Sequence, residues 1–446
     1  MKRKLSFPEG FLWGVAVSSH QVEGNNFNNQ WWAWEQMPGN IWHGDKSGIA
    51  CNWWENAEED FDRAQQMGVN AMRLSLEWSR IEPHEGQFDR SAIERYREML
   101  EGLRRRGIEP MVTLHHFTNP LWLEVKGGWE NPRVVDYFRR YVRYAVDSLG
   151  DVVSKWCTVN EPVVYAMQSY LSGLFPPGRH SFVKAFRVLN HMLKAHGHAY
   201  RIIHYLQSDA EVGIAKNLRP LVPEDPHNPM DVRMARFLSY LFNDLGIRPA
   251  YDGWLRPPLS FRIAPYYPLV DTLDFVGVNY YSPTVVKFNP LKFGQLFMEW
   301  GPPKDVELSD SGRYGPYGGI VPAGLYWSIK FASEFGKPIY ITENGVPDAD
   351  DDIRPRFILT HLAQVHRAIS EGYDVRGYYH WSLIDNFEWS EGWGLRFGLI
   401  ELDVETQERR LRRSGRMYGE IARENGITDE IVEAYVPEVM EEIFGA

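Results

Sequence analysis

Cysteine is almost absent from this sequence, because only Cys51 and Cys157 occur among its 446 residues. Two cysteines cannot form the dense disulfide framework that small secreted proteins use. The N-terminus starts with basic residues, but Pro8, Glu9 and Gly10 interrupt the apolar stretch that a signal peptide requires. We therefore expect a reducing, cytoplasmic location.

Long hydrophobic runs and an excess of positive charge are also missing. No apolar stretch approaches the roughly 18 residues of a membrane span, and the formal net charge is −11. We therefore expect neither membrane insertion nor nucleic-acid binding, which is typical of basic surfaces. A glycine-rich phosphate turn is missing too, because the first predicted strand (11–17) runs into SSHQVEG. Its absence argues against a doubly wound nucleotide-binding sheet.

Aromatic residues, by contrast, are abundant: 17 Trp, 23 Tyr and 23 Phe make up 14% of the chain. Aromatic side chains bury much apolar area, so a large hydrophobic core explains many of them. A second explanation is a sugar-binding site, because the apolar C–H faces of pyranose rings stack on indole rings. Composition alone favours the core, and only the positions of individual residues can identify a sugar site.

A repeated unit organises the chain, in which a helix ends at a glycine and a short apolar strand follows. Five predicted helices end in this way, at Gly68, Gly107, Gly150, Gly336 and Gly372. A glycine at this position commonly adopts the left-handed conformation that terminates a helix. In the helix before Gly107, four apolar residues fall on one face: Ile93, Tyr96, Leu100 and Leu103.

Three further apolar strands, at 11–17, 211–217 and 273–279, bring the number of predicted strands to eight. Alternating helices and apolar strands predict a parallel sheet, and eight strands in one long chain predict a (β/α)8 barrel. Two irregular stretches, 24–55 and 282–320, follow strands on the side where barrels build their active sites. We expect them to shape the site as βα loops, within one domain that spans residues 1–446.

Two predicted strands end on a glutamate. TVNEP contains Glu161, and ITENG contains Glu343. A buried acid is costly unless it is paired, so two strand-end acids suggest a pair that meets in space. All strand C-termini of a barrel open on one face. Further polar and aromatic residues lie in or just after the strands: Gln21, Arg73, His115, His116, Asn160, Asn279, Tyr281, Trp381, Glu388 and Trp389.

Each of these residues alone has a structural explanation, such as a loop cap or a core side chain. Together they predict a cup that binds a polyol. A metal site is the weaker hypothesis, because the adjacent His115 and His116 point to opposite faces of a strand and no HExxH or CxxC motif occurs. The acidic run DADDDIRP (348–355) lacks the ligand spacing and closing glutamate of an EF-hand. We expect a solvated loop there, and no metal.

The two glutamates fit glycoside hydrolysis. That reaction needs one carboxyl to protonate the leaving oxygen and a second to attack the anomeric carbon or to activate water. Arg73, if it points inward, would favour the ionised form of Glu343 that a nucleophile requires. Glu161 has drier neighbours in Asn160 and Pro162, which suits a general acid.

The chain resembles glycoside hydrolase family one, the retaining β-glucosidases and β-galactosidases, from FPEGFLWG to RFGLIELD. The resemblance implies double displacement with Glu343 as nucleophile and Glu161 as acid/base, and no cofactor. It implies that the sugar hydroxyls are bound by Gln21, His116, Asn160, Glu388 and Trp389. It also implies that Tyr281 and Arg73 orient Glu343 and that Asn279 orders the pocket. Its floor and edge would be Trp381 and Phe397.

The implied substrate is a small β-glycoside or short β-linked oligosaccharide, as in cellulose degradation, with glucosides, galactosides and fucosides accepted. A 6-phospho-β-glycosidase is the weaker alternative, because Glu388 would repel a phosphate and the Lys–Tyr clamp of that branch is missing. A non-catalytic sugar-binding barrel is disfavoured because both acids are present. The chain departs from the family pattern at Phe117 and Gly318, where Trp is usual. The oligomeric state, including a homo-oligomer, is left open.

Overall fold

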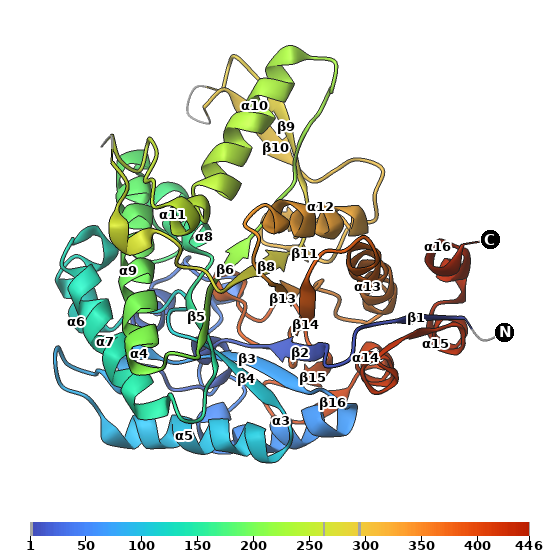
Figure 1. Cartoon of the computed structure of the whole chain (residues 1–446), viewed down its shortest axis with the longest axis horizontal. Helices are drawn as coiled ribbons and strands as arrows, with labels where there is room; N and C mark the ends of the chain where they lie inside the picture. Colours follow the sequence, from blue (N-terminus) through green and yellow to red (C-terminus); the bar gives the residue numbers. More distant parts are fainter. Residues whose placement is uncertain (1–2, 262–263, 293–295, 446) are drawn as a thin grey trace.

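A computed structural model describes residues 3–261, 264–292 and 296–445 (Figure 1). Its centre is a closed barrel of parallel strands in the order β13-β14-β2-β3-β4-β5-β6-β8. These strands are β2 (Leu12–Ala16), β3 (Ala71–Ser75), β4 (Glu109–Thr113), β5 (Lys155–Asn160), β6 (Glu211–Asn217), β8 (Phe275–Tyr280), β13 (Ile339–Asn344) and β14 (Val375–Trp381). The predicted (β/α)8 barrel is confirmed, with a barrel strand in each of the predicted strand segments.

The barrel strands are buried on both faces, which explains their apolar composition. Every residue of β8 and of β13 is buried, because the outer face of a barrel strand packs against helices and the inner face packs within the barrel. In both strands the polar residues Asn279 and Glu343 come near the C-terminal end, after the apolar residues. The strands therefore form the core and present polar groups at one end of the barrel.

Long helices surround the barrel (Figure 1). They are α3 (Trp53–Met67), α5 (Arg90–Arg105), α7 (Val134–Leu149), α9 (Phe182–Leu206), α12 (Pro322–Ser333), α13 (Arg354–Ser370) and α14 (Arg413–Glu424). The apolar face predicted for α5 is buried, and the Asp89 side chain caps this helix by accepting the N–H groups of Ser91 and Ala92. Across the described residues, no helix is both long and apolar enough to cross a membrane.

Shorter elements complete the chain. The helices among them are α1 (Ser19–Val22), α2 (Gln30–Glu35), α4 (Trp78–Ile81), α6 (Leu121–Val125), α8 (Pro162–Met167), α11 (Arg248–Asp252), α15 (Asp429–Tyr435) and α16 (Met440–Phe444). The first strand, β1 (Lys4–Ser6), pairs with β17 (Gly426–Thr428) and so ties the two ends of the chain together. A small hairpin joins β15 (Ile400–Leu402) and β16 (Arg409–Leu411).

The predicted glycine terminators are confirmed at four positions and wrong at the fifth. Positive φ angles occur at Gly68, Gly107, Gly336 and Gly372. Gly150 instead has a right-handed φ of −63°, because the chain continues there in a tight turn whose amides bond back to the last residues of α7. A Cβ atom at Gly150 would lie 2.8 Å from the Val146 carbonyl oxygen. This glycine therefore permits close packing and does not supply a left-handed conformation.

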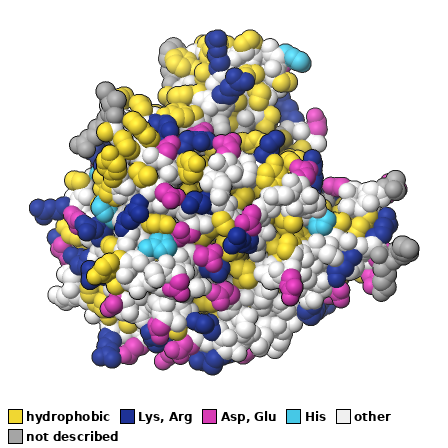
Figure 2. Space-filling model, in the orientation of Figure 1, with side chains coloured by type: hydrophobic (Ala, Val, Ile, Leu, Met, Phe, Trp, Pro, Cys, Tyr) yellow, Lys and Arg dark blue, Asp and Glu magenta, His cyan; other side chains and the backbone are white. Residues whose placement is uncertain are grey.

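The predicted loop 282–320 is not irregular throughout. It contains β9 (Thr284–Phe288), which pairs with β10 (Met298–Gly301) and with β7 (Leu221–Pro223). This sheet packs against α10 (Pro229–Ser239) around a small separate core of Ala235, Val286 and Met298. The resulting lobe projects beyond the barrel (Figure 1), and hydrophobic side chains gather on its visible face (Figure 2).

The contact between β13 and β14 at the site end of the barrel gives a first testable prediction. A Cβ atom on Gly345, directly after β13, would lie 1.8 Å from the carbonyl oxygen of Trp381. We expect Gly345→Ala to lower the free energy of unfolding by about 3 kcal/mol, because overpacking forces the backbone apart. Urea unfolding measures this change.

Gly102→Ala is the matched control, because its Cβ would meet only side-chain atoms, the nearest at 3.6 Å, inside α5. We expect it to be neutral or stabilising by about 0.5–1 kcal/mol, as for Gly to Ala in a helix. Equal stability of the two variants would contradict the described contact.

Candidate active site

The site residues predicted from the strands and from the family resemblance come together at the C-terminal end of the barrel, where hydrogen bonds and ring contacts occur among them. All of them are buried: Gln21, Arg73, His116, Asn160, Glu161, Asn279, Tyr281, Glu343, Trp381, Glu388, Trp389 and Phe397. The backbone order of the barrel explains this convergence, because β3, β5, β8, β13 and β14 end on the same face.

The Glu343 carboxylate is held through both of its oxygens. The Arg73 guanidinium donates to Oε1 at 2.5 Å, and the Tyr281 hydroxyl donates to Oε2 at 2.6 Å. Arg73 and Glu343 are both buried, so this is a charge-assisted pair inside the barrel. The two donors fix the direction in which the carboxylate faces.

Burial has the largest influence on the pKa of Glu343. It raises the pKa of this carboxyl from 4.5 to about 7, although the charge of Arg73 opposes the rise and the charge of Glu161 adds to it. The sequence suggested that an inward-pointing Arg73 would keep Glu343 ionised. That expectation is only half right, because the cost of removing the carboxylate from water exceeds the attraction of the cation.

Glu161 lies at the end of β5 in a different environment. Its backbone is left-handed, with φ 43° and ψ 59°, and it directly precedes helix α8. The amide groups of Asn279 and Asn217 both donate to Oε1, at 2.8 and 3.1 Å. In the described part of the chain Oε2 accepts no hydrogen bond, so one oxygen of this carboxyl is free to serve a ligand.

Asn217 was missed in the sequence although it ends a predicted strand. Its signal was the same as that of Asn160 or Asn279, namely an amide at the C-terminal end of a barrel strand. Thr342 was missed as well, and its hydroxyl donates to Oδ1 of the Asn279 side chain at 2.6 Å. These contacts leave the Asn279 amide group pointing at Glu161.

His116 and His115 have separate partners, as predicted for adjacent strand-end residues. The Asn160 amide bonds His116 Nε2 at 3.0 Å, whereas His115 Nε2 bonds Asn119 at 3.0 Å. Burial holds the pKa of His116 well below its usual range. The imidazole is therefore neutral, and its Nδ1 has no hydrogen-bond partner among the described residues. A ligand hydroxyl could satisfy this buried nitrogen.

Glu388 forms the other polar end of the cup. The Gln21 amide donates to its Oε2 at 3.1 Å. Burial, followed by the neighbouring charge of Glu343, raises the pKa of Glu388 from 4.5 to about 8. The charged groups with the largest influence on it are the acids Glu343, Glu391 and Glu161.

Aromatic rings close the cup around these polar groups. The rings of Trp381 and Trp389 stack near the His116 ring, with centroids 5.9 and 6.0 Å away. Phe117 occupies the position where tryptophan is usual in the family. Its ring packs 5.2 Å from the Trp389 ring, and its backbone has a left-handed φ of 70°. Its ring supports Trp389 and adds no hydrogen-bond donor.

A partly exposed tyrosine at the rim was not predicted. The Tyr317 ring lies 5.7 Å from Tyr281 and 5.2 Å from Phe397, and 39% of the residue is exposed. Its neighbour Gly318 packs so closely on Ser282 that a Cβ atom would lie 2.5 Å from the serine Cβ. The tryptophan that is usual in the family at this position would clash with Ser282. Tyr317 is the aromatic residue next to Gly318.

The acidic run 348–355 was expected to be a solvated loop, and this is wrong for two of its acids and for Arg354 and Pro355, which are all buried. Asp348 and Asp351 are buried. Asp348 Oδ2 accepts the N–H groups of Ile353 and Arg354 at the start of α13, which is a helix-capping role. Asp348 is therefore buried because its carboxylate accepts the amides at the start of α13.

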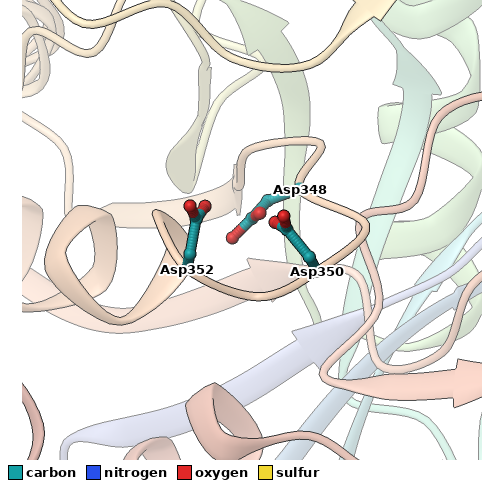
Figure 3. A group of neighbouring side chains, drawn as sticks. All are labelled: Asp348, Asp350 and Asp352. Atoms are coloured by element: carbon teal, nitrogen blue, oxygen red, sulfur yellow. The ribbon is translucent and has the colours of Figure 1, made fainter.

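The same run contains the group of acids that could hold a cation among the described residues. Asp348, Asp350 and Asp352 each offer an oxygen, and these oxygens lie within 4.8 Å of one another. Figure 3 shows the three carboxylates facing one another on the loop. Asp350 and Asp352 are exposed, and none of the three belongs to the carboxyl groups of the cup.

Known proteins match this chain over nearly its whole length. Residues 3–427 match the model of Glycosyl hydrolase family 1. A solved β-glycosidase from Pyrococcus horikoshii is 41% identical, with a TM-score of 0.90, covering 98% of this chain and 100% of that chain. β-Glucosidase A of Thermotoga maritima is 35% identical, covering 95% of this chain and 99% of its own. The β-galactosidase of Pyrococcus woesei is 33% identical, covering 96% and 99%.

The raised pKa of Glu388 gives a prediction about stability. Because its folded-state pKa is about 8 and its ordinary value is 4.5, the stability it contributes is complete at low pH. That contribution is lost as the pH rises through the folded-state pKa. Glu388→Gln removes this titration. We expect the variant to be more stable than the native protein by a few kcal/mol at about pH 8 and nearly equal below about pH 4.5, since one pKa unit corresponds to about 1.4 kcal/mol.

Urea unfolding across this pH range measures the difference. The exposed Glu55 provides the control variant Glu55→Gln, which should show no such pH-dependent gain. A stability difference for Glu388→Gln that stays constant with pH would contradict the raised pKa.

Proposed function

The chain belongs to glycosyl hydrolase family 1 and is a retaining β-glycosidase, and we propose that Glu343 is its nucleophile and Glu161 its acid/base. The observation that carries this assignment is the difference between the two carboxyl environments. Glu343 is held by a cation and a phenol, whereas Glu161 is held by two amides and has one oxygen without a hydrogen bond from the described residues. The first environment suits an oriented carboxylate, and the second suits a carboxyl that gains and loses a proton.

In the first step, a Glu343 carboxylate oxygen attacks the anomeric carbon, and the bond to the leaving oxygen breaks. Glu161 gives its proton to that oxygen, so the leaving group departs as a neutral alcohol. Arg73 and Tyr281 hold Glu343 in place before the attack. The nucleophile must be ionised, and because burial raises its pKa to about 7, the attacking form becomes abundant only near neutral pH.

In the second step, the Glu161 carboxylate takes a proton from water, and the resulting hydroxide equivalent attacks the anomeric carbon from the face that the leaving group left. The ester bond to Glu343 breaks, and the carboxylate returns to its contacts with Arg73 and Tyr281. Two displacements restore the β configuration at the anomeric carbon. The protons balance, because Glu161 ends the cycle protonated.

We propose that the cup binds the non-reducing sugar of a β-glucoside, with β-galactosides and β-fucosides also accepted. Relatives named as β-glucosidase and β-galactosidase support the first two of these substrates. The sugar hydroxyls meet Gln21, His116, Asn160, Glu388 and Trp389. The free Nδ1 of His116 donates to one of them, Trp381 lies under the ring, and Phe397 lies at its edge.

A 6-phosphoglycoside remains the weaker substrate. The pKa of Glu388, raised to about 8, reduces the charge repulsion on which that inference first rested, because a protonated acid repels little. The surroundings still oppose a phosphate, since the charged groups with the largest influence on Glu388 are the acids Glu343, Glu391 and Glu161.

We further propose that residues 1–446 form a single domain, that the enzyme acts in the cytoplasm, and that its substrates are small glycosides or short β-linked oligosaccharides. Complexes of the T. maritima β-glucosidase with glucoimidazole and related compounds support sugar-like ligands in this fold (TM-score 0.87 at 34% identity, covering 95% of this chain and 100% of that chain for the glucoimidazole complex). Hydrogen bonding between β1 and β17, which ties the chain ends together, supports one folding unit.

Azide rescue tests the two catalytic roles. Glu343→Gly should abolish hydrolysis of nitrophenyl β-glucoside, and azide should restore turnover by filling the vacated space. The product should be the α-glycosyl azide, because a single displacement inverts the anomeric carbon. If Glu343→Gly gave the β-glycosyl azide and Glu161→Ala gave the α-glycosyl azide, the two catalytic roles would have to be reversed.

Glu161→Ala should behave differently. For alkyl glucosides we expect kcat/KM to fall by about 10²–10⁴-fold, the usual contribution of general acid catalysis. The first step with dinitrophenyl glucoside should be spared, because its leaving group needs no proton. Azide should then yield the β-glycosyl azide by attack on the intermediate. Appreciable residual activity in both variants without azide rescue would refute the two-carboxylate mechanism.

Chelation tests whether a bound cation takes part. The proposed steps use only carboxyl, hydroxyl, amide and guanidinium groups, so we expect EDTA to leave kcat/KM unchanged. The variant Asp350→Asn, in the acidic loop of Figure 3, should also retain full activity. Loss of activity on chelation and recovery with a divalent cation would show that a bound cation takes part in the reaction.

A further inference from the structure

A cavity lies between α3, α14 and the β15–β16 hairpin, elements that lie together in Figure 1. Its volume is about 420 Å³, which is within the usual range for small-molecule sites. Its α3 residues belong to the last turns before β3, so they lie toward the N-terminal ends of the strands, whereas the cup opens at the C-terminal ends. None of the described residues that line this cavity belongs to the cup, and the mechanism above does not use it.

Arginine predominates among the charged residues of the cavity. Glu420 is the acid among its described lining residues, and the arginines are Arg63, Arg409, Arg416 and Arg423. This excess of positive charge occurs in a protein whose formal net charge is −11. The gathering of arginines at one cavity therefore needs an explanation.

Two of the four arginines have structural partners. Arg63 Nη1 lies 2.8 Å from the Asp60 carboxylate, and Arg409 Nε lies 3.5 Å from the same carboxylate. The Arg409 guanidinium also donates to the backbone carbonyls of Gln407 and Cys51, and its side chain is only 8% exposed. These contacts attach the hairpin to α3, so packing explains Arg63 and Arg409.

The other two arginines have no counter-ion in the part of the chain that the structure describes. There the Arg416 side chain forms neither a hydrogen bond nor an ion pair. Arg423 donates only from Nη1, to the carbonyl oxygens of Gln66 and Met67 at 3.2 and 3.0 Å. Capping of α3 explains that one nitrogen. Both arginines are exposed, so their remaining N–H groups are available to a ligand.

Helix α14 places Arg416 and Arg423 on one face. Residues seven positions apart are separated by two turns, or about 10 Å along the helix axis, and Gly419 lies between them. A Cβ atom on Gly419 would lie 2.5 Å from the Met67 carbonyl oxygen, because α3 and α14 approach closely there. One exposed arginine is ordinary, but two unpaired arginines that share a cavity form a site for an anion.

The lining indicates the class of anion. Guanidinium groups bind phosphate through paired N–H groups, and two of them at this spacing suit a ligand that carries more than one phosphate. Apolar residues also line the cavity, namely Met67, Ile400 and Leu411. They provide contacts for an organic group attached to the phosphates.

We propose that this cavity binds a small anion that carries two or more phosphate groups, held by Arg416 and Arg423. Inorganic pyrophosphate and nucleoside polyphosphates share this chemistry. Binding involves no covalent step. Because the cavity lies between α3 and α14, the bound anion connects a helix near the start of the chain to one near its end.

Titration calorimetry of the intact enzyme with pyrophosphate and with ATP, free of divalent cations and at constant ionic strength, tests this proposal. We expect saturable binding to a single site. Arg416→Gln and Arg423→Gln should each weaken the affinity by about tenfold, as for the loss of a hydrogen bond to a charged group. Arg143→Gln, at an exposed arginine on α7, should leave the affinity unchanged.

Arg416→Gln loses no side-chain contact within the described chain, so it decides the matter even if Arg423→Gln, which removes a cap of α3, fails to fold. Unchanged kcat/KM for nitrophenyl β-glucoside shows that the variant is folded. Tighter binding of ATP than of pyrophosphate would place the organic group on the apolar lining, and equal affinities would assign binding to the phosphates alone. Either result supports the site.

Three results would overturn the proposal. The first is a lack of saturable binding, or equal affinity in the native enzyme and in folded Arg416→Gln. The second is competitive inhibition of glycoside hydrolysis by pyrophosphate, which would place the anion in the cup. The third is tighter binding of citrate than of either phosphate compound, which would contradict the assignment to phosphate.

Discussion

The buried pair between Arg73 and Glu343 is the interaction on which the rest of the site depends. The guanidinium also donates to Thr113 on β4 at 3.1 Å and to Asn160 on β5 at 2.6 Å, so one side chain of β3 bridges to β4, β5 and β13. Burying both charges is costly, and this cost is offset only if every donor finds its acceptor. The arginine thereby fixes both the nucleophile and Asn160, which in turn holds His116.

The two carboxyl groups differ in their partners more than in their burial. Glu343 and Glu161 are both nearly inaccessible, at 3% and 6% exposure. One is oriented by a cation and a phenol, and the other by two neutral amides. Identical side chains thus meet different hydrogen-bond donors at the two positions.

The sequence predicted the barrel and most of the cup, because a polar residue at the end of a buried strand has few structural explanations. It could not predict environments that depend on distant neighbours. Tyr317 lies in a long segment where no periodicity marks it, and its importance follows from contacts with Tyr281 and Phe397. Gly150 has the sequence context of a left-handed terminator, but its conformation is set by the following turn. The net pKa of Glu343 also required the structure, since burial and the charge of Arg73 act in opposite directions.

The central claim is that Glu343 forms the covalent bond to the sugar. Incubation with dinitrophenyl 2-deoxy-2-fluoro-β-glucoside should trap that intermediate, because the fluorine slows its hydrolysis more than its formation when the leaving group is good. Mass spectrometry of the digested protein should then place one fluoroglucosyl group on the peptide that contains ITENG, at Glu343. A label on Glu161 or Glu388, or inactivation without any covalent label, would contradict the account.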